Sequence, residues 1–320
     1  MKVQRISERA RQKNERGNVK MTTCGNIVEV VEMARVNKRG TSIIPLGGDA
    51  YVKMKDFDFR TGEITGDGVQ YYKRTENRGE NKSGIAASMK AVRDLINCNV
   101  TDPSHARWLT LTYAENMTDA KRLYIDRKNF WKRVLRWHKS RGYPTPEYIS
   151  VVEPQGRGAW HLHELWLYPD KAPYLPNDDV RELWEQGFVT VKRLDDVDNV
   201  GAYLTAYLCD VPLDEAEKAG LNIAGCELKT AEITQEDGTK IPKKYVKGAR
   251  LNLYPNKMNF YRTSRGVKRP EVVWTSGEKA KEKVSAATLT FSKTIRLSSD
   301  DFTNDIHYEY YNLVRGKSQD

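Results

Sequence analysis

Several features are missing from the 320-residue chain, and each absence excludes a class of protein. No hydrophobic run is long enough to cross a membrane, and the N-terminus is basic and polar rather than signal-like, so we expect a cytoplasmic protein with no membrane partner. The four cysteines are scattered and form no C-x-x-C pair, which argues against a zinc ribbon or a disulfide framework. A phosphate-binding loop of the type G-x-x-x-x-G-K-S/T is also missing, so the chain carries no helicase motor of that kind.

Basic charge is in excess, with a formal net charge of +10. Residues 121–141 hold nine basic residues against one acid, and residues 240–270 hold ten basic residues and no acid. Aromatic residues interleave the second segment: Tyr245, Tyr254, Phe260 and Tyr261. Basic groups can follow a phosphate backbone while aromatic rings stack on unpaired bases, so the second segment favours a nucleic-acid partner. The first segment alone is more typical of a solvated helix face than of a nucleic-acid site.

The basic side chains predicted to contact DNA come from these two segments and from a glycine-rich turn between them. They are Lys128, Lys132, Arg157, Lys243, Lys244, Lys247, Arg250, Arg262, Arg265, Lys268 and Arg269.

Hydrophobic periodicity predicts the fold class of the central part. Alternation predicts strands over 107–113, 147–153, 159–168 and 188–193, and helical spacing predicts helices over 118–141, 178–186 and 200–209. The order β-α-β-β-α-β-α predicts an α+β domain, with an antiparallel sheet and helices on one side. We expect this domain at 101–215, preceded by a flexible basic arm at 1–20 and a β-rich accessory region at 21–100. A basic accessory region that binds DNA follows at 216–320, with a strand pair near 271–274 and 287–297.

Two of the five histidines lie one residue apart in a strand-like segment. His161 and His163 then point to the same face, since side chains at i and i+2 of a strand share a face. If residues 156–158 form a three-residue hairpin loop with Gly158 in the left-handed conformation, Glu153 lies opposite His161. A two-residue loop would place Glu153 opposite Trp160 instead.

This hairpin predicts a metal site. Two imidazoles and one carboxylate can hold a divalent ion and leave open positions for substrate oxygens. Glu164 is a spare carboxylate, but strand alternation turns it to the other face. The pattern His-x-His alone is equally typical of buried, hydrogen-bonded histidines.

Tyr203 and Tyr207 lie four residues apart on a predicted helix and therefore share a face. Aromatic pairs at this spacing usually belong to a core. Small neighbours such as Gly201 would leave the face around them open, and a phenol can act as a nucleophile. Because its pKa is about 10, it needs help at neutral pH, which a metal ion on a phosphodiester would supply.

Together these motifs resemble the HUH endonucleases, in particular rolling-circle replication initiators of plasmids and phages. Trp108-Leu-Thr-Leu-Thr-Tyr113 looks like the first family motif, His161-Leu-His163 like the metal-binding motif, and Tyr203 with Tyr207 like the two-tyrosine motif. The resemblance covers roughly residues 105–210. A lysine that many members carry three residues after the nucleophile is replaced here by Ala206 and Asp210, which leaves open which tyrosine attacks first.

The resemblance implies an enzyme that nicks single-stranded DNA at an origin hairpin. A tyrosine would form a 5′-phosphotyrosine and free a 3′-hydroxyl for a host polymerase, and a host helicase would unwind the duplex. Glu153, His161 and His163 would hold Mn²⁺ or Mg²⁺. The second tyrosine would rejoin the strand after one round of synthesis.

Other functions stay open from the sequence. A transposase or a relaxase of the same superfamily would use the same site. A cupin-like metal enzyme also places His-x-His on a strand, but it usually wants a glutamate shortly afterwards, where Trp166 and Leu167 stand here. A non-catalytic DNA-binding regulator would need only the charge.

Overall fold

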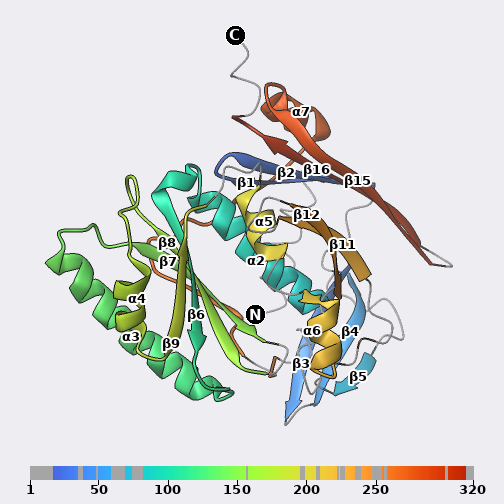
Figure 1. The fold of residues 1–320 in the computed structure, drawn as a ribbon. Coiled ribbons are helices and arrows are strands. Elements are labelled where there is room, and N and C mark those ends of the chain that lie inside the picture. Colours follow the sequence, from blue (N-terminus) through green and yellow to red (C-terminus); the bar gives the residue numbers. More distant parts are fainter. Residues whose placement is uncertain are drawn as a thin grey trace. The chain divides into compact units, whose positions relative to one another are not determined.

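The computed structural model describes most of the chain and divides it into two compact units (Figure 1). One unit combines Met1–Thr75 with Pro270–Asp320, and the other is Glu76–Arg269. The described residues are 17–34, 39–47, 50–58, 69–73, 82–155, 158–194, 199–206, 210–221, 223, 228–234, 239–246, 249, 254–255, 258–299 and 302–314. The domain boundaries expected from the sequence differ from the boundaries of these two units, and they stay predictions.

The central unit, Glu76–Arg269, is built on a five-stranded sheet with the order β13-β7-β8-β6-β9, in which all neighbours are antiparallel. Its strands are β6 (Ala106–Tyr113), β7 (Glu147–Pro154), β8 (Trp160–Leu167), β9 (Gly187–Lys192) and β13 (Tyr261–Thr263). The predicted α+β class with an antiparallel sheet is therefore confirmed.

Helix α3 (Ala120–Ser140) covers one face of this sheet, and α4 (Asn177–Trp184) lies on the same face. Asp119 caps α3, since its carboxylate accepts hydrogen bonds from the N–H groups of the first turn. Phe130 stacks on Trp166 of β8 at 6.0 Å between ring centroids and contacts Trp184 of α4 edge-on. The helix thus forms where its spacing and its cap predict it.

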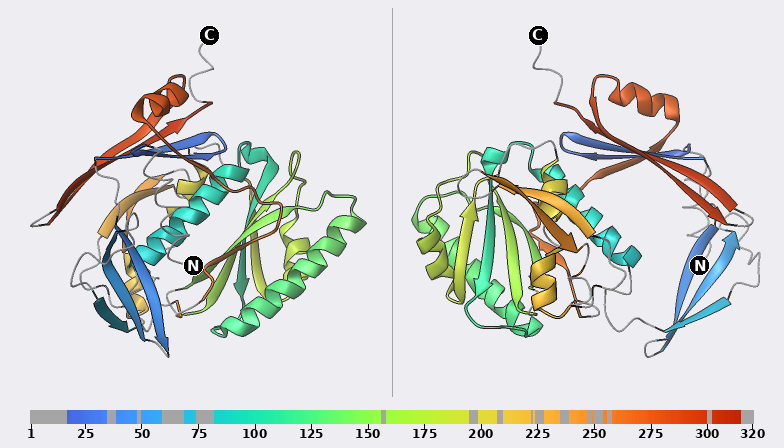
Figure 2. Two further views of the ribbon diagram at one scale, coloured as in Figure 1. Left: turned by 180° about the vertical axis from the view of Figure 1, so that it is seen from behind. Right: turned by 45° about the vertical axis from the view of Figure 1, so that its right-hand side comes forward.

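Helices α2 (Lys82–Asn99) and α5 (Val200–Ala206) lie on the opposite face (Figures 1 and 2). Arg262 of β13 stacks on Tyr124 of α3, so its neighbours Tyr261 and Thr263 point to the other side, where they share a pocket with Ser88 of α2. The expectation that helices lie on one side is wrong. Both faces carry buried apolar residues, so both need cover.

Residues 211–246 of the central unit contain more strand than their sequence indicates. The three-stranded sheet β10-β12-β11 is formed by β10 (Val211–Pro212), β11 (Leu228–Thr234) and β12 (Lys240–Val246). Helix α6 (Leu213–Lys218) packs beside it, with Ala216 and Val246 in a small shared core. The sequence predicts an irregular, partly helical segment up to about residue 240, because polar and charged residues mask the alternation.

The other unit contains a second five-stranded antiparallel sheet, β14-β1-β2-β16-β15, covered on one face by α7 (Gly277–Val284). Its strands are β1 (Val19–Cys24), β2 (Ile27–Met33), β14 (Glu271–Thr275), β15 (Thr288–Ser299) and β16 (Phe302–Asn312). The expected pairing of 271–274 with 287–297 is wrong, because β14 pairs with β1 and β15 pairs with β16. Pairing partners far apart in sequence leave no local signal.

The same unit also contains the three-stranded sheet β3-β4-β5, formed by β3 (Arg39–Gly47), β4 (Ala50–Asp58) and β5 (Val69–Lys73). The strands expected between residues 26 and 73 are thus present. The predicted basic arm lies mostly outside the described residues, which begin at Gly17.

Candidate metal centre

The β7–β8 hairpin has the predicted register. Gly158 has a φ of +85°, in the left-handed region, and the N–H of Gln155 donates to the carbonyl of Ala159 at 2.7 Å. Glu153 consequently lies opposite His161, and Val151 lies opposite His163. The two imidazoles and the carboxylate therefore share one face of two neighbouring strands.

His163 is held from three sides. Its Nε2 contacts a carboxylate oxygen of Glu153, its Nδ1 lies 3.3 Å from the hydroxyl of Thr110, and its ring stacks on Trp108 at 5.3 Å between centroids. Burial lowers the pKa of His163 to about 4, so the imidazole is neutral at neutral pH. A neutral imidazole donates from one ring nitrogen and accepts at the other, so it can donate from Nε2 to the Glu153 carboxylate while Nδ1 accepts from the Thr110 hydroxyl.

Two imidazoles and a carboxylate suit a divalent ion, but in the structure the carboxylate contacts one imidazole and leaves no room for an ion between them. Glu153 is 3 % exposed, and its carboxylate contacts Nε2 directly, at the position where a metal would bond to the imidazole. Across the described ranges, no group of three or more His, Cys, Asp or Glu side chains is spaced to hold a metal as it stands. With bonds of about 2.0–2.1 Å to each ligand, Mg²⁺ would require Glu153 to draw back from His163.

Thr110 could then keep the imidazole oriented in either state. Its hydroxyl can accept a hydrogen bond from Nδ1–H once Nε2 is a ligand, as readily as it donates to Nδ1 now. Neither Thr110 nor Trp108 stands out in the sequence as a partner of His163. Their alternation in the strand 107–113 is visible, but only the pairing of β6 with β8 turns it toward the imidazoles.

Helix α5, which includes position 203, is fixed closely against α2. The N–H of Gly201 donates to the side chain of Asn97 at 2.8 Å, and a Cβ on Gly201 would lie only 2.4 Å from the carbonyl oxygen of Arg93. The small residue at position 201 therefore allows close contact between the two helices. The side chain of Tyr203 and all of Tyr207 lie outside the described residues.

Residues 106–211 match the family model of the replication-associated protein ORF2. The match covers a third of the chain, and it includes Glu153, both histidines and both tyrosines. No curated protein and no solved structure matches the chain.

The match supports a replication-associated protein of the Rep type. In the described part of the chain, no helix is long and apolar enough to cross a membrane.

The imidazole face is open at the β9 edge of the sheet. Phe188 lies opposite Thr112, which lies opposite His161, so the three residues form one row across the strands. Phe188 is 67 % exposed, while Leu165 and Ile149, farther along the same face, are fully buried. Solvent or a ligand can thus approach the histidines from β9.

The predicted DNA-binding residues are spread over several surfaces. Lys128 and Lys132 are exposed on α3, across the sheet from the imidazoles. Lys243 lies 3.7 Å from Asp214, and Lys244 is exposed on the same strand, β12. The remaining described ones are exposed on β13 and in the segment that follows it: Arg262, Arg265, Lys268 and Arg269. Those predicted at Arg157, Lys247 and Arg250 lie outside the described residues.

The aromatic residues of the second basic segment have different positions. Tyr254 and Phe260 are buried in the core, and the Tyr254 hydroxyl donates to the carbonyl of Val152 at 2.6 Å. Tyr261 and Tyr245 are half-buried. The expectation that the whole set could stack on bases is wrong for the two buried rings.

Proposed function

We propose that the protein is a rolling-circle replication initiator that nicks and rejoins single-stranded DNA through a tyrosine. One observation carries the proposal. Glu153, His161 and His163 share one face of adjacent strands, inside the segment that matches a replication-associated family. Helix α5, with position 203, packs on α2, which lies on the same side of the sheet as the imidazoles, because Tyr261 is in the row of His163 and shares a pocket with Ser88 of α2.

The reaction would be a transesterification. The phenol of Tyr203 or Tyr207 attacks the scissile phosphorus, the bond from phosphorus to the 3′-oxygen breaks, and the phenolic proton is balanced by the proton that the released 3′-oxygen gains. The products are a 5′-phosphotyrosine and a free 3′-hydroxyl. Attack by a 3′-hydroxyl on the phosphotyrosine releases the phenol and reforms a phosphodiester, so the strand is rejoined without net hydrolysis. The other phenol would cleave the regenerated origin in the same way as the first and so free that 3′-hydroxyl.

The protein's own groups would prepare the site for this exchange. Glu153, His161 and His163 would hold Mn²⁺ or Mg²⁺, which when bound neutralises charge on the phosphate. Thr110 and Trp108 fix the ring of His163. The close contact of Gly201 with α2 fixes the start of the tyrosine helix relative to the sheet.

The family match favours an initiator over a transposase or a relaxase. A non-catalytic DNA-binding protein is the second candidate, because the carboxylate closes directly onto the imidazole and the basic surface alone could bind DNA. The cupin-like enzyme has no comparable support.

Covalent capture of DNA separates an enzyme from a simple binder. The full chain is incubated with a library of single-stranded origin hairpins and Mn²⁺, and tryptic peptides are searched for a nucleotide-modified tyrosine. We expect the adduct on the peptide with Tyr203 or Tyr207, and none from the double variant Tyr203→Phe, Tyr207→Phe. Equal DNA binding by the double variant is the control that it is folded.

His161→Ala tests the metal site in the same assay. It should abolish the adduct and leave the salt-sensitive binding of DNA intact. If metal-stripped protein formed the adduct as well as loaded protein, the role assigned to Glu153, His161 and His163 would be wrong.

A further inference from the structure

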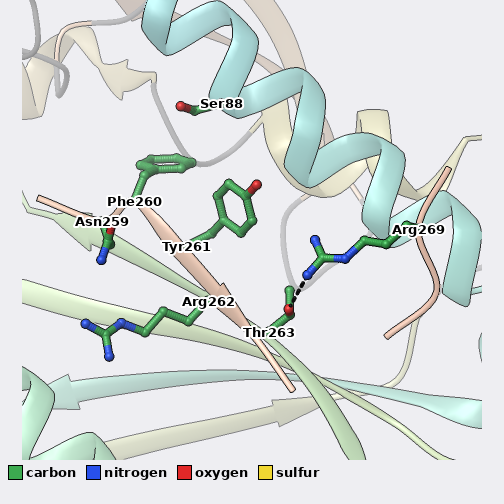
Figure 3. A pocket seen from close by; sticks show the side chains of 7 residues that line it. All are labelled: Ser88, Asn259, Phe260, Tyr261, Arg262, Thr263 and Arg269. Atoms are coloured by element: carbon green, nitrogen blue, oxygen red, sulfur yellow. Dashed lines mark hydrogen bonds between the residues drawn. The ribbon is translucent and has the colours of Figure 1, made fainter. Parts of the chain in front are cut away.

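A pocket of about 430 Å³ opens beside the edge strand β13 of the central sheet (Figure 3). This volume lies within the range of about 300–1,000 Å³ that is typical of small-molecule sites. Tyr261 and Phe260 point toward Ser88 of α2 in this view, and Arg269 reaches in from the opposite side toward Thr263. Arg262 lies at the rim and points away, over Tyr124 of α3.

The pocket lies on the same face of the sheet as the candidate metal centre. Tyr261 pairs with Val151, and Val151 pairs with His163, so the three residues form one row across β13, β7 and β8. Neighbouring strands are about 4.8 Å apart, so Tyr261 stands about 10 Å from His163 along this row. A stacked single strand rises about 3.4 Å per nucleotide, so the pocket is within about three nucleotides of a phosphate at the imidazoles.

The lining of the pocket suits a nucleotide. The guanidinium of Arg269 points into the pocket and no carboxylate lines it, so the pocket attracts an anion. An N–H of Arg269 donates to the Thr263 hydroxyl at 3.0 Å, which aims the side chain at the cavity. This hydrogen bond uses one N–H of Arg269, and a guanidinium carries five N–H donors, so others can reach a phosphate in the cavity. The ring of Tyr261 is half-buried and offers an aromatic surface beside this cation.

We propose that this pocket binds one nucleotide of the single-stranded substrate, with the base against Tyr261 and a backbone phosphate on Arg269. This proposal rests on the proposed function and deepens it: it assigns a subsite for the strand that flanks the reacting phosphate. Phe260 forms the wall of the pocket behind Tyr261. The ring of Tyr254 packs against the ring of Phe260 at 5.3 Å between centroids.

The test is equilibrium binding of a fluorescein-labelled oligothymidylate to the full chain, followed by anisotropy. Arg269→Ala should weaken binding on the order of fivefold or more, and should make the slope of log Kd against log salt shallower by about 0.7. Tyr261→Leu keeps an apolar side chain but loses the ring, so it should weaken binding on the order of fivefold or more with an unchanged salt slope. Tyr261→Phe keeps the aromatic ring and should therefore bind the oligothymidylate with wild-type affinity.

Arg136→Ala is the matched charge control. Arg136 is exposed on α3, across the sheet from the pocket, and its removal changes the net charge by the same amount. It should leave both affinity and salt slope nearly unchanged. If it weakens binding as much as Arg269→Ala does, the effect is general electrostatics and the proposal is wrong.

A free nucleotide could satisfy the same chemistry, so thymidine monophosphate is a second arm of the experiment. Tight binding of the monophosphate that depends on Arg269, together with unchanged oligothymidylate binding, would assign the pocket to a free nucleotide and overturn the proposal. The two proposals also fail differently. A protein that forms the tyrosine adduct but binds DNA normally after Arg269→Ala keeps its function and loses this subsite. A protein that needs Arg269 for binding but never forms the adduct keeps the subsite and loses the proposed function.

Discussion

Replacing Glu164 with glutamine should cost stability and spare metal binding, although Glu164 is the sequence neighbour of His163. Strand alternation turns the two residues to opposite faces of β8. Glu164 is fully buried against α3, where its two carboxylate oxygens accept hydrogen bonds from Arg127 at 3.0 and 3.1 Å. Glu164→Gln therefore leaves a buried guanidinium without its counter-charge.

The expected cost follows from the surroundings of Arg127. Its side chain is only 9 % exposed, so water cannot replace the lost carboxylate. Breaking a buried ion pair by removing one partner costs about 3–5 kcal/mol. The guanidinium also lies 3.8 Å from the centroid of the Tyr148 ring, and glutamine keeps one hydrogen-bond acceptor, so we expect the lower end, about 3 kcal/mol.

Urea unfolding followed by tryptophan fluorescence measures this loss. Trp131 and Trp166 lie close to the pair and report on this part of the central unit. The double variant Arg127→Met, Glu164→Leu removes both charges and should recover to within about 1 kcal/mol of wild type. The matched control is Glu153→Gln, the same substitution on the opposite face, which should abolish Mn²⁺ binding in calorimetry, whereas Glu164→Gln should retain it. A loss below about 1 kcal/mol for Glu164→Gln, or a double variant as unstable as the single one, would refute the reasoning.

Three further predictions concern the tyrosine helix, a buried histidine and the metal. Gly201→Ala should push α5 off α2, because its Cβ would lie 2.4 Å from a backbone oxygen of α2; we expect tyrosine–DNA adduct formation to fall at least tenfold while DNA binding, measured by anisotropy, is unchanged. His138 is fully buried, and burial lowers its pKa from the ordinary value near 6.5, so the unfolded chain binds a proton more readily. Stability should therefore fall as the pH drops below about 6.5, and urea midpoints between pH 7 and 5 should fall less steeply in His138→Gln. Chelation with EDTA should stop adduct formation and Mn²⁺ should restore it; for His161→Ala, added Mn²⁺ should restore nothing.

Local sequence patterns predict the helices and hairpins whose stabilising contacts lie between residues close together in the chain. The glycine at position 158 and the alternation on either side predict the β7–β8 hairpin, and a three-residue loop would put Glu153 opposite His161, whereas a two-residue loop would put it opposite Trp160; the structure shows the first register. In the same way, a cap at Thr118 or Asp119 and the spacing of Leu123, Phe130 and Val134 predict α3, and the structure shows that Asp119 is the cap. The α+β class and the shared face of His161 and His163 follow from these elements alone, whereas the position of Glu153 on that face depends on the length of the loop.

Only the tertiary structure decided which surfaces those elements meet. Nothing local indicates that α2 and α5 cover the imidazole face, that β14 pairs with β1, or that Phe260 is buried and Tyr261 half-buried in the wall of one pocket. That pocket joins Ser88 to Arg269, which are far apart along the chain. Such contacts depend on which distant segments pack against one another, and this is decided by the packing of the whole unit. Hydrophobic periodicity describes only the few residues on either side of each position, so it cannot predict these contacts.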